Sequence, residues 1–188
     1  MPNHTGRLVL TTADPQADPA PALVAAALSE AGFIGPRLSL PGLAFSVGPR
    51  FLSLLAFTGC AVAIVSAPSG TGGVPYCHVR ISELEPVPRL LCGRNTRPPR
   101  CPACRARLGD WKMRLDAWAE RPQMGLGCPA CGASRPPWRW DWKEQAGFGR
   151  RFVLVEEVFP GEAVPTRALL DCLTGACESG WRHFYVQD

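Results

Sequence analysis

The apolar positions near the N-terminus form short runs and one helical stripe, which together predict three elements. Residues 7–11 are a short apolar run typical of a strand. The pair Asp18-Pro19 suggests the start of a helix, and the stripe that follows predicts a helix over residues 19–31. Residues 38–47 are apolar but interrupted by a Pro-Gly pair, which indicates a broken strand or a hairpin.

Further along, apolar runs flank a loop rich in glycine and serine. The pattern predicts a helix over residues 49–57, a strand over 61–65 and another strand over 76–81. The loop at 66–75 follows a strand, so a phosphate-binding loop is one hypothesis. A hairpin loop is favoured, because no Lys-Ser/Thr pair follows the glycines and the next segment is strand-like.

The C-terminal end repeats the order of elements at the N-terminal end. The pattern predicts a strand over 152–159, a helix over 165–173 and a strand over 181–186. Strand, helix and strand at each end predict an α+β fold, with a mixed or antiparallel sheet and helices on one face. We expect residues 1–92 and 148–188 to form this core domain, with residues 93–147 as an inserted module.

Residues 51–67 are 17 consecutive uncharged residues, close to the length of a membrane span. Ser53 and the pair Thr58-Gly59 interrupt this run, so a buried helix followed by a buried strand is the favoured interpretation, with a membrane helix as the alternative. The N-terminal residues lack the long apolar segment of an export signal. We therefore expect a cytoplasmic protein that does not bind membranes and keeps its nine cysteines reduced.

Charge is unevenly distributed along the 188 residues, whose formal net charge is +4. Residues 86–151 hold 14 Lys/Arg and 5 Asp/Glu, whereas the rest of the chain is acidic. Arginine outnumbers lysine 18 to 2, and alanine, glycine and proline are abundant. A GC-rich, bacterial-like genome produces such a composition, so arginine content alone is weak support for nucleic-acid binding.

Two identical tetrapeptides, Cys101-Pro102-Ala103-Cys104 and Cys128-Pro129-Ala130-Cys131, lie 23 residues apart within the basic region. Each pair can present two sulfurs from one tight turn, so the two pairs can supply four thiolates to one metal ion. Cys101, Cys104, Cys128 and Cys131 are therefore the predicted metal ligands. Cys92 could replace one of them but is not needed.

These two knuckles resemble the zinc ribbon family over about residues 98–142, under a third of the chain, and we recognise no full-length family. The resemblance implies one zinc ion held by four cysteines, with no open position for water and hence a structural role. Gly132 matches the family habit after the second knuckle, whereas Arg105 departs from it after the first. A redox or iron–sulfur site is the competing interpretation.

The residues between the knuckles have a helical apolar pattern. Leu108, Trp111, Leu115 and Trp118 recur at helical spacing, and Asp110 is a plausible cap. We therefore expect a helix between the two knuckles.

Basic and aromatic residues surround the knuckles and suggest a binding surface. Its predicted members are Arg97, Arg100, Arg107, Trp138, Arg139, Trp140 and Trp142. The arginines could instead neutralise a four-thiolate site, which carries a formal charge of −2 with Zn²⁺. Alternation of the tryptophans with charged residues predicts a strand with three indoles on one face, which either fill the module's core or form a platform for bases or a partner.

Other cysteines and histidines do not suggest a second site. Cys77-His78, Cys172, Cys177 and His183 lack metal-ligand spacing, and the sequence contains no catalytic motif. The expected function is a zinc-ribbon binding or adaptor protein that contacts a protein or nucleic acid. The alternatives are an enzyme or small-ligand-binding α+β domain braced by the ribbon, and a nucleic-acid-binding factor. The sequence leaves the oligomeric state open.

Overall fold

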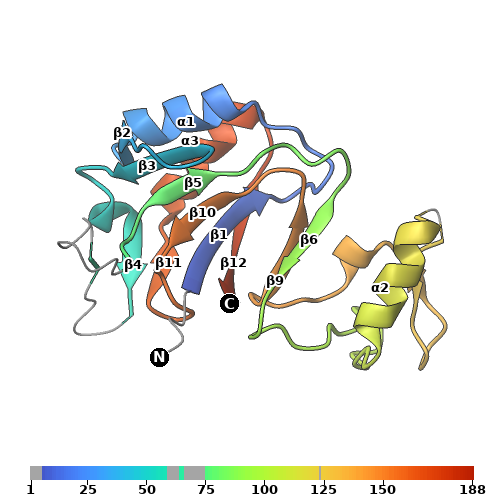
Figure 1. Ribbon diagram of the computed structural model, residues 1–188. Coiled ribbons are helices and arrows are strands. Elements are labelled where there is room, and N and C mark those ends of the chain that lie inside the picture. The colour runs from blue at the N-terminus through green and yellow to red at the C-terminus, as the bar shows by residue number, and fades with distance from the viewer. Residues whose placement is uncertain (1–5, 59–63, 66–74, 123) are drawn as a thin grey trace.

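A six-stranded antiparallel sheet forms the centre of the molecule (Figure 1). The computed structural model describes residues 6–58, 64–65, 75–122 and 124–188. In spatial order the strands are β12 (Trp181–Gln187), β1 (Gly6–Thr12), β10 (Val153–Glu156), β5 (Val79–Ile81), β3 (Leu43–Val47) and β2 (Ile34–Arg37). Each neighbouring pair is antiparallel, so hairpins and longer connections build the sheet without parallel crossovers.

Two helices, α1 (Pro21–Glu30) and α3 (Arg167–Cys177), lie together on one face of this sheet (Figure 1). Strand residues alternate between faces, so Leu8 and Leu10 of β1 join the core beneath the helices. Leu28 of α1 and Leu169 of α3 are fully buried in the same core. Each such side chain stabilises the fold by about 1.5–3 kcal/mol relative to full exposure.

On the opposite face of the sheet, a two-stranded ribbon of β6 (Arg89–Cys92) and β9 (Ala146–Gly149) packs over β12 and β1. Leu91 packs on a cluster that contains Val9 and Phe184 of the sheet, whereas Leu90 joins a separate cluster on the other side of the ribbon. Glycine permits this close packing: a Cβ on Gly147 would lie 2.7 Å from Phe184 Cδ1. The ribbon thus lies between two apolar clusters, with β9 buried along its whole length and β6 half-buried or exposed.

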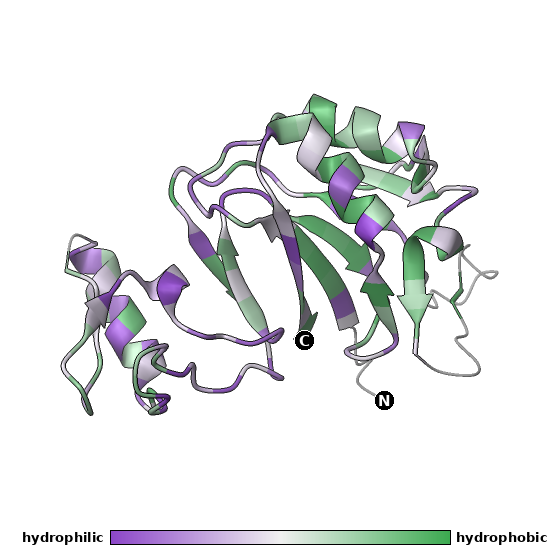
Figure 2. Ribbon diagram, turned by 180° about the vertical axis from the view of Figure 1, so that it is seen from behind, coloured by the Kyte–Doolittle hydropathy of each residue, from purple (hydrophilic) through white to green (hydrophobic). Residues whose placement is uncertain are grey.

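Between β6 and β9 the chain makes an excursion, residues 93–145, that contains both cysteine pairs. Its elements are α2 (Trp111–Glu120), β7 (Leu126–Gly127), β8 (Ser134–Arg135) and the 3₁₀ helix η3 (Pro137–Arg139). The excursion projects beyond the ribbon and is largely hydrophilic where it joins β6 and β9, while the central strands of the large sheet are hydrophobic (Figure 2).

The start of the excursion is tied to the edge of the large sheet. Arg94 N donates to Gln187 O at 2.8 Å, and Asn95 Nδ2 donates to Tyr185 O at 2.8 Å. These bonds satisfy backbone groups on the outer edge of β12, which would otherwise be an open template for another strand.

The α+β class, with helices on one face of a mainly antiparallel sheet, is confirmed, as are the strands and helices predicted at both ends of the chain, with shifted bounds. The interrupted run around Pro41-Gly42 is a hairpin of β2 and β3, and Gly42 takes a φ of +77° in its turn. The division into a core domain and an inserted module at residues 93–147 remains a prediction.

Two predictions near the N-terminus are wrong. Residues 49–57 form a short 3₁₀ helix, η1 (Leu52–Leu54), and the strand β4 (Leu55–Phe57), which pairs with β11 (Ala163–Pro165). That pairing is a tertiary contact which overrides the local helical pattern. Asp18 does not cap α1, because the helix begins later, at Pro21, after Ala20.

The strand predicted over 61–65 and the loop predicted over 66–75 lie mostly outside the described residues. The same holds for part of the uncharged run at 51–67. In the part of the chain that the structure describes, none of the helices has the length and apolar character needed to cross a membrane.

Candidate metal centre

The two cysteine pairs form turns with the same backbone hydrogen bonds. In each turn the first cysteine accepts a bond at its carbonyl from the residue four positions later and donates from its N–H to the carbonyl five positions later. The bonds are Arg105 N to Cys101 O (2.8 Å), Cys101 N to Ala106 O (2.8 Å), Gly132 N to Cys128 O (2.9 Å) and Cys128 N to Ala133 O (2.9 Å). The repeated tetrapeptide therefore folds into a repeated structure.

A left-handed residue ends both turns, although only one of the two is glycine. Gly132 has φ +71° and Arg105 has φ +65°. Glycine adopts this conformation without steric cost, whereas an L-residue with a side chain is disfavoured by roughly 1–2 kcal/mol. Arg105 thus replaces the glycine of the ribbon pattern, but the backbone keeps the same left-handed conformation. Its guanidinium is ion-paired with Asp141, Nη1 to Oδ2 at 2.8 Å.

The four sulfurs of Cys101, Cys104, Cys128 and Cys131 all lie within 4.8 Å of one another. The Cys101 and Cys131 sulfurs are 3.8 Å apart, and those of Cys104 and Cys128 are 3.6 Å apart. A disulfide bond is about 2.05 Å long, so these four residues are free thiols that converge on one point. The predicted ligand set is therefore brought together by the fold as a group that could hold a metal ion.

The environment of the four thiols favours the ionisation of some of them but opposes the ionisation of all four at the same time. Hydrogen bonds from the backbone N–H groups of Cys131 and Ala130 lower the pKa of Cys128 to about 6. The pKa of Cys104 is raised to about 12: the backbone N–H of Ala106 lowers it, but burial and the neighbouring thiols outweigh that bond. Several thiolates at this distance repel one another unless a cation lies between them.

Four sulfur donors and no carboxylate suit a soft metal ion, with zinc and iron as the common choices in a tetrahedral sulfur site. Cys101 and Cys128 are buried, whereas Cys104 and Cys131 reach the surface. The donor set is complete within the chain and leaves no ligand position for water in a four-coordinate site.

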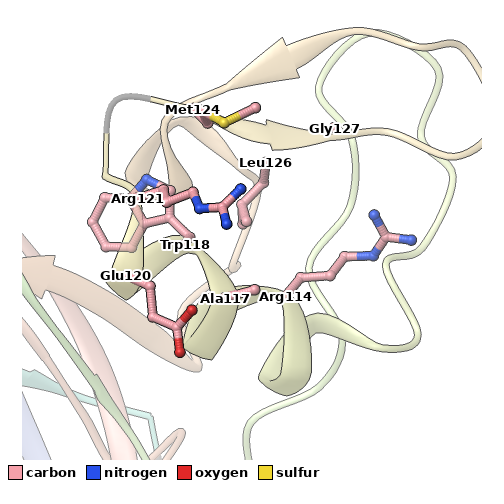
Figure 3. Close-up of a pocket in the computed structure, with 9 residues that line it drawn as sticks. Arg114, Ala117, Trp118, Glu120, Arg121, Met124, Leu126 and Gly127 are labelled. Carbon is pink, nitrogen blue, oxygen red and sulfur yellow. The ribbon is translucent and has the colours of Figure 1, made fainter.

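Arg114 of α2 is a neighbour of this site that the sequence did not reveal. Its Nε lies 2.8 Å from Asp110 Oδ2, and this ion pair raises the pKa of Arg114, with a smaller electrostatic contribution from Cys128. Arg114 also lines a pocket of about 400 Å³ between α2 and β7 (Figure 3). The close-up shows Trp118, Leu126 and Met124 around that pocket, with the Arg121 guanidinium beside them.

The tryptophans predicted to form one face of a strand are instead part of the excursion's core. Trp140 and Trp142 are 4% and 3% exposed, and Trp138 is half-buried. Trp142 packs edge-to-face on Trp111 with ring centroids 5.3 Å apart, and its Nε1 donates to Pro137 O at 2.9 Å. The prediction that Trp140 and Trp142 belong to an exposed binding platform is therefore wrong. The alternative prediction, that they fill the core of the module, is confirmed.

The predicted strand over these tryptophans is also wrong, for a local reason. Pro136 and Pro137 precede Trp138, and proline fixes φ and has no N–H for a strand ladder. Residues 137–139 accordingly form η3. Arg139, at the end of η3, is exposed.

The three arginines Arg97, Arg100 and Arg107 line one pocket of about 440 Å³, together with Asp141 and Lys143. The backbone of Arg100 forms isolated bridges with both Arg107 and Asp141. Arg100 N donates to Asp141 O and Asp141 N donates to Arg100 O, each at 3.0 Å. Arg100 immediately precedes the ligand Cys101, so the pocket and the metal site share a segment of chain.

The remaining candidates do not join the cluster. Cys77 is 1% exposed, and burial raises its pKa to about 12. Cys172 and Cys177 are half-buried on α3, and His183 has its pKa lowered by burial. Cys92 is exposed at the end of β6 and is not among the four clustered sulfurs.

Comparison with family models, with curated proteins and with solved structures found no match to this chain.

Proposed function

We propose that the four cysteines hold one structural zinc ion and that the protein is a binding or adaptor protein. In this account the excursion is a zinc ribbon whose arginine pocket contacts an acidic macromolecular partner. Arg97, Arg100 and Arg107 are the residues proposed to make that contact.

The sulfur geometry supports zinc as the ion. Sulfurs bound at about 2.3 Å to a tetrahedral zinc ion are about 3.8 Å apart, which matches the separations of 3.8 and 3.6 Å. Strand β7 precedes the second knuckle and β8 follows it, so the knuckle is the turn of a β-hairpin. The equivalent hydrogen bonds in both knuckles also support the likeness to a zinc ribbon. A closed four-sulfur site has no position for substrate or activated water, so the role proposed for the ion is structural.

The observation that carries the binding role is the gathering of arginines without partners. In the described residues, no hydrogen bond or ion pair engages the guanidinium groups of Arg97, Arg100 and Arg107. Asp141, the carboxylate of the pocket, is already paired with Arg105 and with Lys143. Neutralisation of the thiolates alone would not require the three arginines to line a pocket. The carboxylate of that pocket is already paired, so the arginines are free to bind an external anion.

The brace hypothesis is a second candidate, favoured by the packing of the ribbon. Phe148 of β9 joins the excursion's core, while the neighbouring Gly147 packs on Phe184 of the large sheet. The metal site could thus stabilise an α+β domain whose own activity lies elsewhere. A nucleic-acid-binding factor is less well supported, since the buried Trp140 and Trp142 offer no stacking surface for bases.

The test is binding of labelled acidic probes to the metal-loaded full chain, with a glutamate-rich peptide, single-stranded DNA and double-stranded DNA at low and rising salt. We expect at least one probe to bind, with affinity that falls as salt rises. For a DNA probe, each of Arg100→Ala and Arg107→Ala should lower the slope of log K against log salt by about one.

Arg135→Ala is the matched control, because it removes one exposed positive charge from the excursion outside the pocket. Absence of binding to all three probes at low salt, or equal losses in all three variants, would contradict the proposed contact surface and favour the brace.

A further inference from the structure

The pocket lined by Arg97, Arg100, Arg107 and Lys143 has the charge and size of a site for one compact anion. It encloses about 440 Å³, within the range of about 300–1,000 Å³ typical of small-ligand sites. A polyanion such as DNA is usually held by charges spread along a groove. Cations gathered around one pocket are better matched to a single ligand group.

The charge balance of the pocket favours a ligand with more than one negative charge. Four cationic side chains line it against one carboxylate, Asp141. Asp141 Oδ2 is shared between Lys143 Nζ, at 3.4 Å, and Arg105 Nη1, at 2.8 Å, so no carboxylate of the pocket is left for the three arginines. Hydrogen bonds from Lys143 N and Arg105, which outweigh the effect of burial, lower the pKa of Asp141 and keep it ionised.

The backbone holds the arginines in place before any ligand arrives. The backbone of Arg100 exchanges two hydrogen bonds with Asp141 and forms a strand-like bridge with Arg107, which is closed by bonds of the flanking residues. Arg97 N donates to Gln145 Oε1 at 3.2 Å, which fixes the first arginine against the other side of the pocket. Positions fixed along the backbone lower the entropy lost on binding, although the side chains of the arginines still become ordered when a ligand binds.

The chemistry of the guanidinium group selects the ligand. Its planar fork of N–H donors matches the oxygen pairs of phosphate, and a phosphate monoester carries a charge of about −1.5 to −2 at pH 7. We infer that this pocket binds a phosphate monoester, supplied either by a phosphorylated side chain of a protein partner or by a small phosphorylated molecule. This inference rests on the proposed function, because it identifies the group that the arginine surface recognises.

The test is calorimetric titration of the metal-loaded full chain at about pH 8, above the second phosphate pKa of about 6. The probes are phenyl phosphate, its methyl diester, a phosphoserine peptide and the same peptide with glutamate in place of phosphoserine. We expect phenyl phosphate to bind and the singly charged diester to bind at least tenfold more weakly. Tighter binding of the phosphopeptide than of phenyl phosphate identifies a protein partner, and equal binding identifies a small ligand.

Arg100→Ala and Arg107→Ala should each weaken monoester binding about tenfold or more, as expected for lost hydrogen bonds between charged groups. Arg100→Lys should restore only part of the affinity, because lysine keeps the charge but not the fork. Arg135→Ala is the control, and metal content reports whether each variant remains folded.

Equal binding of monoester and diester, no binding of either, or an equal loss in Arg135→Ala would overturn the inference. If the acidic probes of the previous section still bind in an arginine-dependent manner while the monoester does not, the proposed function stands and only the identity of the recognised group is wrong.

Discussion

Arg105 illustrates how a single residue can keep a backbone conformation that its own side chain disfavours. It takes the left-handed position occupied by Gly132 in the second knuckle. Its ion pair with Asp141 links the first knuckle to the segment that follows η3 and that lines the arginine pocket. Exposed ion pairs contribute about 0–1 kcal/mol, so the pair offsets part of the steric cost and also positions Asp141.

Arg105→Gly and Arg105→Ala should therefore differ in stability, although both remove the ion pair. Alanine retains the left-handed steric cost of roughly 1–2 kcal/mol and glycine does not. We expect Arg105→Ala to have the lower free energy of unfolding by about 1 kcal/mol, measured by urea denaturation of the metal-loaded protein. Equal stabilities for the two variants would contradict the left-handed assignment.

At the residue scale, the sequence predicted what depends on spacing along the chain and missed what depends on tertiary contact. The four cysteine ligands follow from a repeated tetrapeptide, so they could be named in advance. The electrostatic influence of Cys128 on the pKa of Arg114 depends on how α2 is placed between the knuckles. The pairing of Arg105 with Asp141 joins residues that are far apart in sequence.

At the scale of elements, the β6–β9 ribbon connects the large sheet to the metal site. Leu90 and Phe148 face the excursion, while Leu91 and Gly147 face the sheet, because side chains alternate along each strand. One ribbon thus contributes to two apolar clusters. A change on one of its faces affects how the excursion sits on the sheet.

Gly147→Ala should destabilise the protein by about 1–3 kcal/mol through overpacking. The added Cβ would lie 2.7 Å from Cδ1 of Phe184, and that ring is 1% exposed and has no room to retreat. Thermal or urea unfolding of the variant gives the measurement.

The matched control is Gly109→Ala, where an added Cβ meets no atom within 4 Å. We expect that variant to stay within about 0.5 kcal/mol of the parent protein. A similar loss of stability in both variants would show that the ribbon does not pack on the sheet as described.

Predictions of elements were correct where the local sequence pattern determines the structure, and wrong where tertiary contacts determine it. Residues 181–186 alternate clearly and lie within β12. Residues 49–57 carry an apolar pattern that fits a helix, but the pairing of β4 with β11 determines their conformation. The alternation at Trp138, Trp140 and Trp142 resembles a strand, yet two prolines and burial against Trp111 and Phe148 place them in an irregular core.

At the scale of the whole molecule, the chain leaves and re-enters the sheet region through adjacent strands. This arrangement supports the predicted division into a core domain and an inserted module. Leu108, Trp111 and Trp142 of the excursion form an apolar cluster that also includes Phe148 of β9. The excursion is tied to the sheet edge by Asn95, which bonds to Tyr185 and Gln187, and by Glu144 O, which accepts from Tyr185 N.

Replacement of residues 96–145 by a short Gly/Ser linker should leave a remainder that unfolds cooperatively. The linker keeps β6 and β9, and the change in loop length costs only about 0.6 kcal/mol per doubling. We expect lower stability than in the full chain, because Leu90 and Phe148 lose their cover. Circular dichroism during denaturation provides the readout, and loss of any cooperative transition would show that the excursion belongs to the core.

The central claim, a four-cysteine site that holds one zinc ion, is tested most directly by metal analysis of protein purified without chelator. Closed sites of this kind bind zinc with apparent free energies of about 10–16 kcal/mol at pH 7, so the metal should survive purification. We predict one zinc per chain, its loss in the double variant Cys104→Ser with Cys131→Ser, and its retention in Cys92→Ser, where the exposed thiol lies outside the cluster. A zinc content near zero in the parent protein, or full retention in the double variant, would contradict the account.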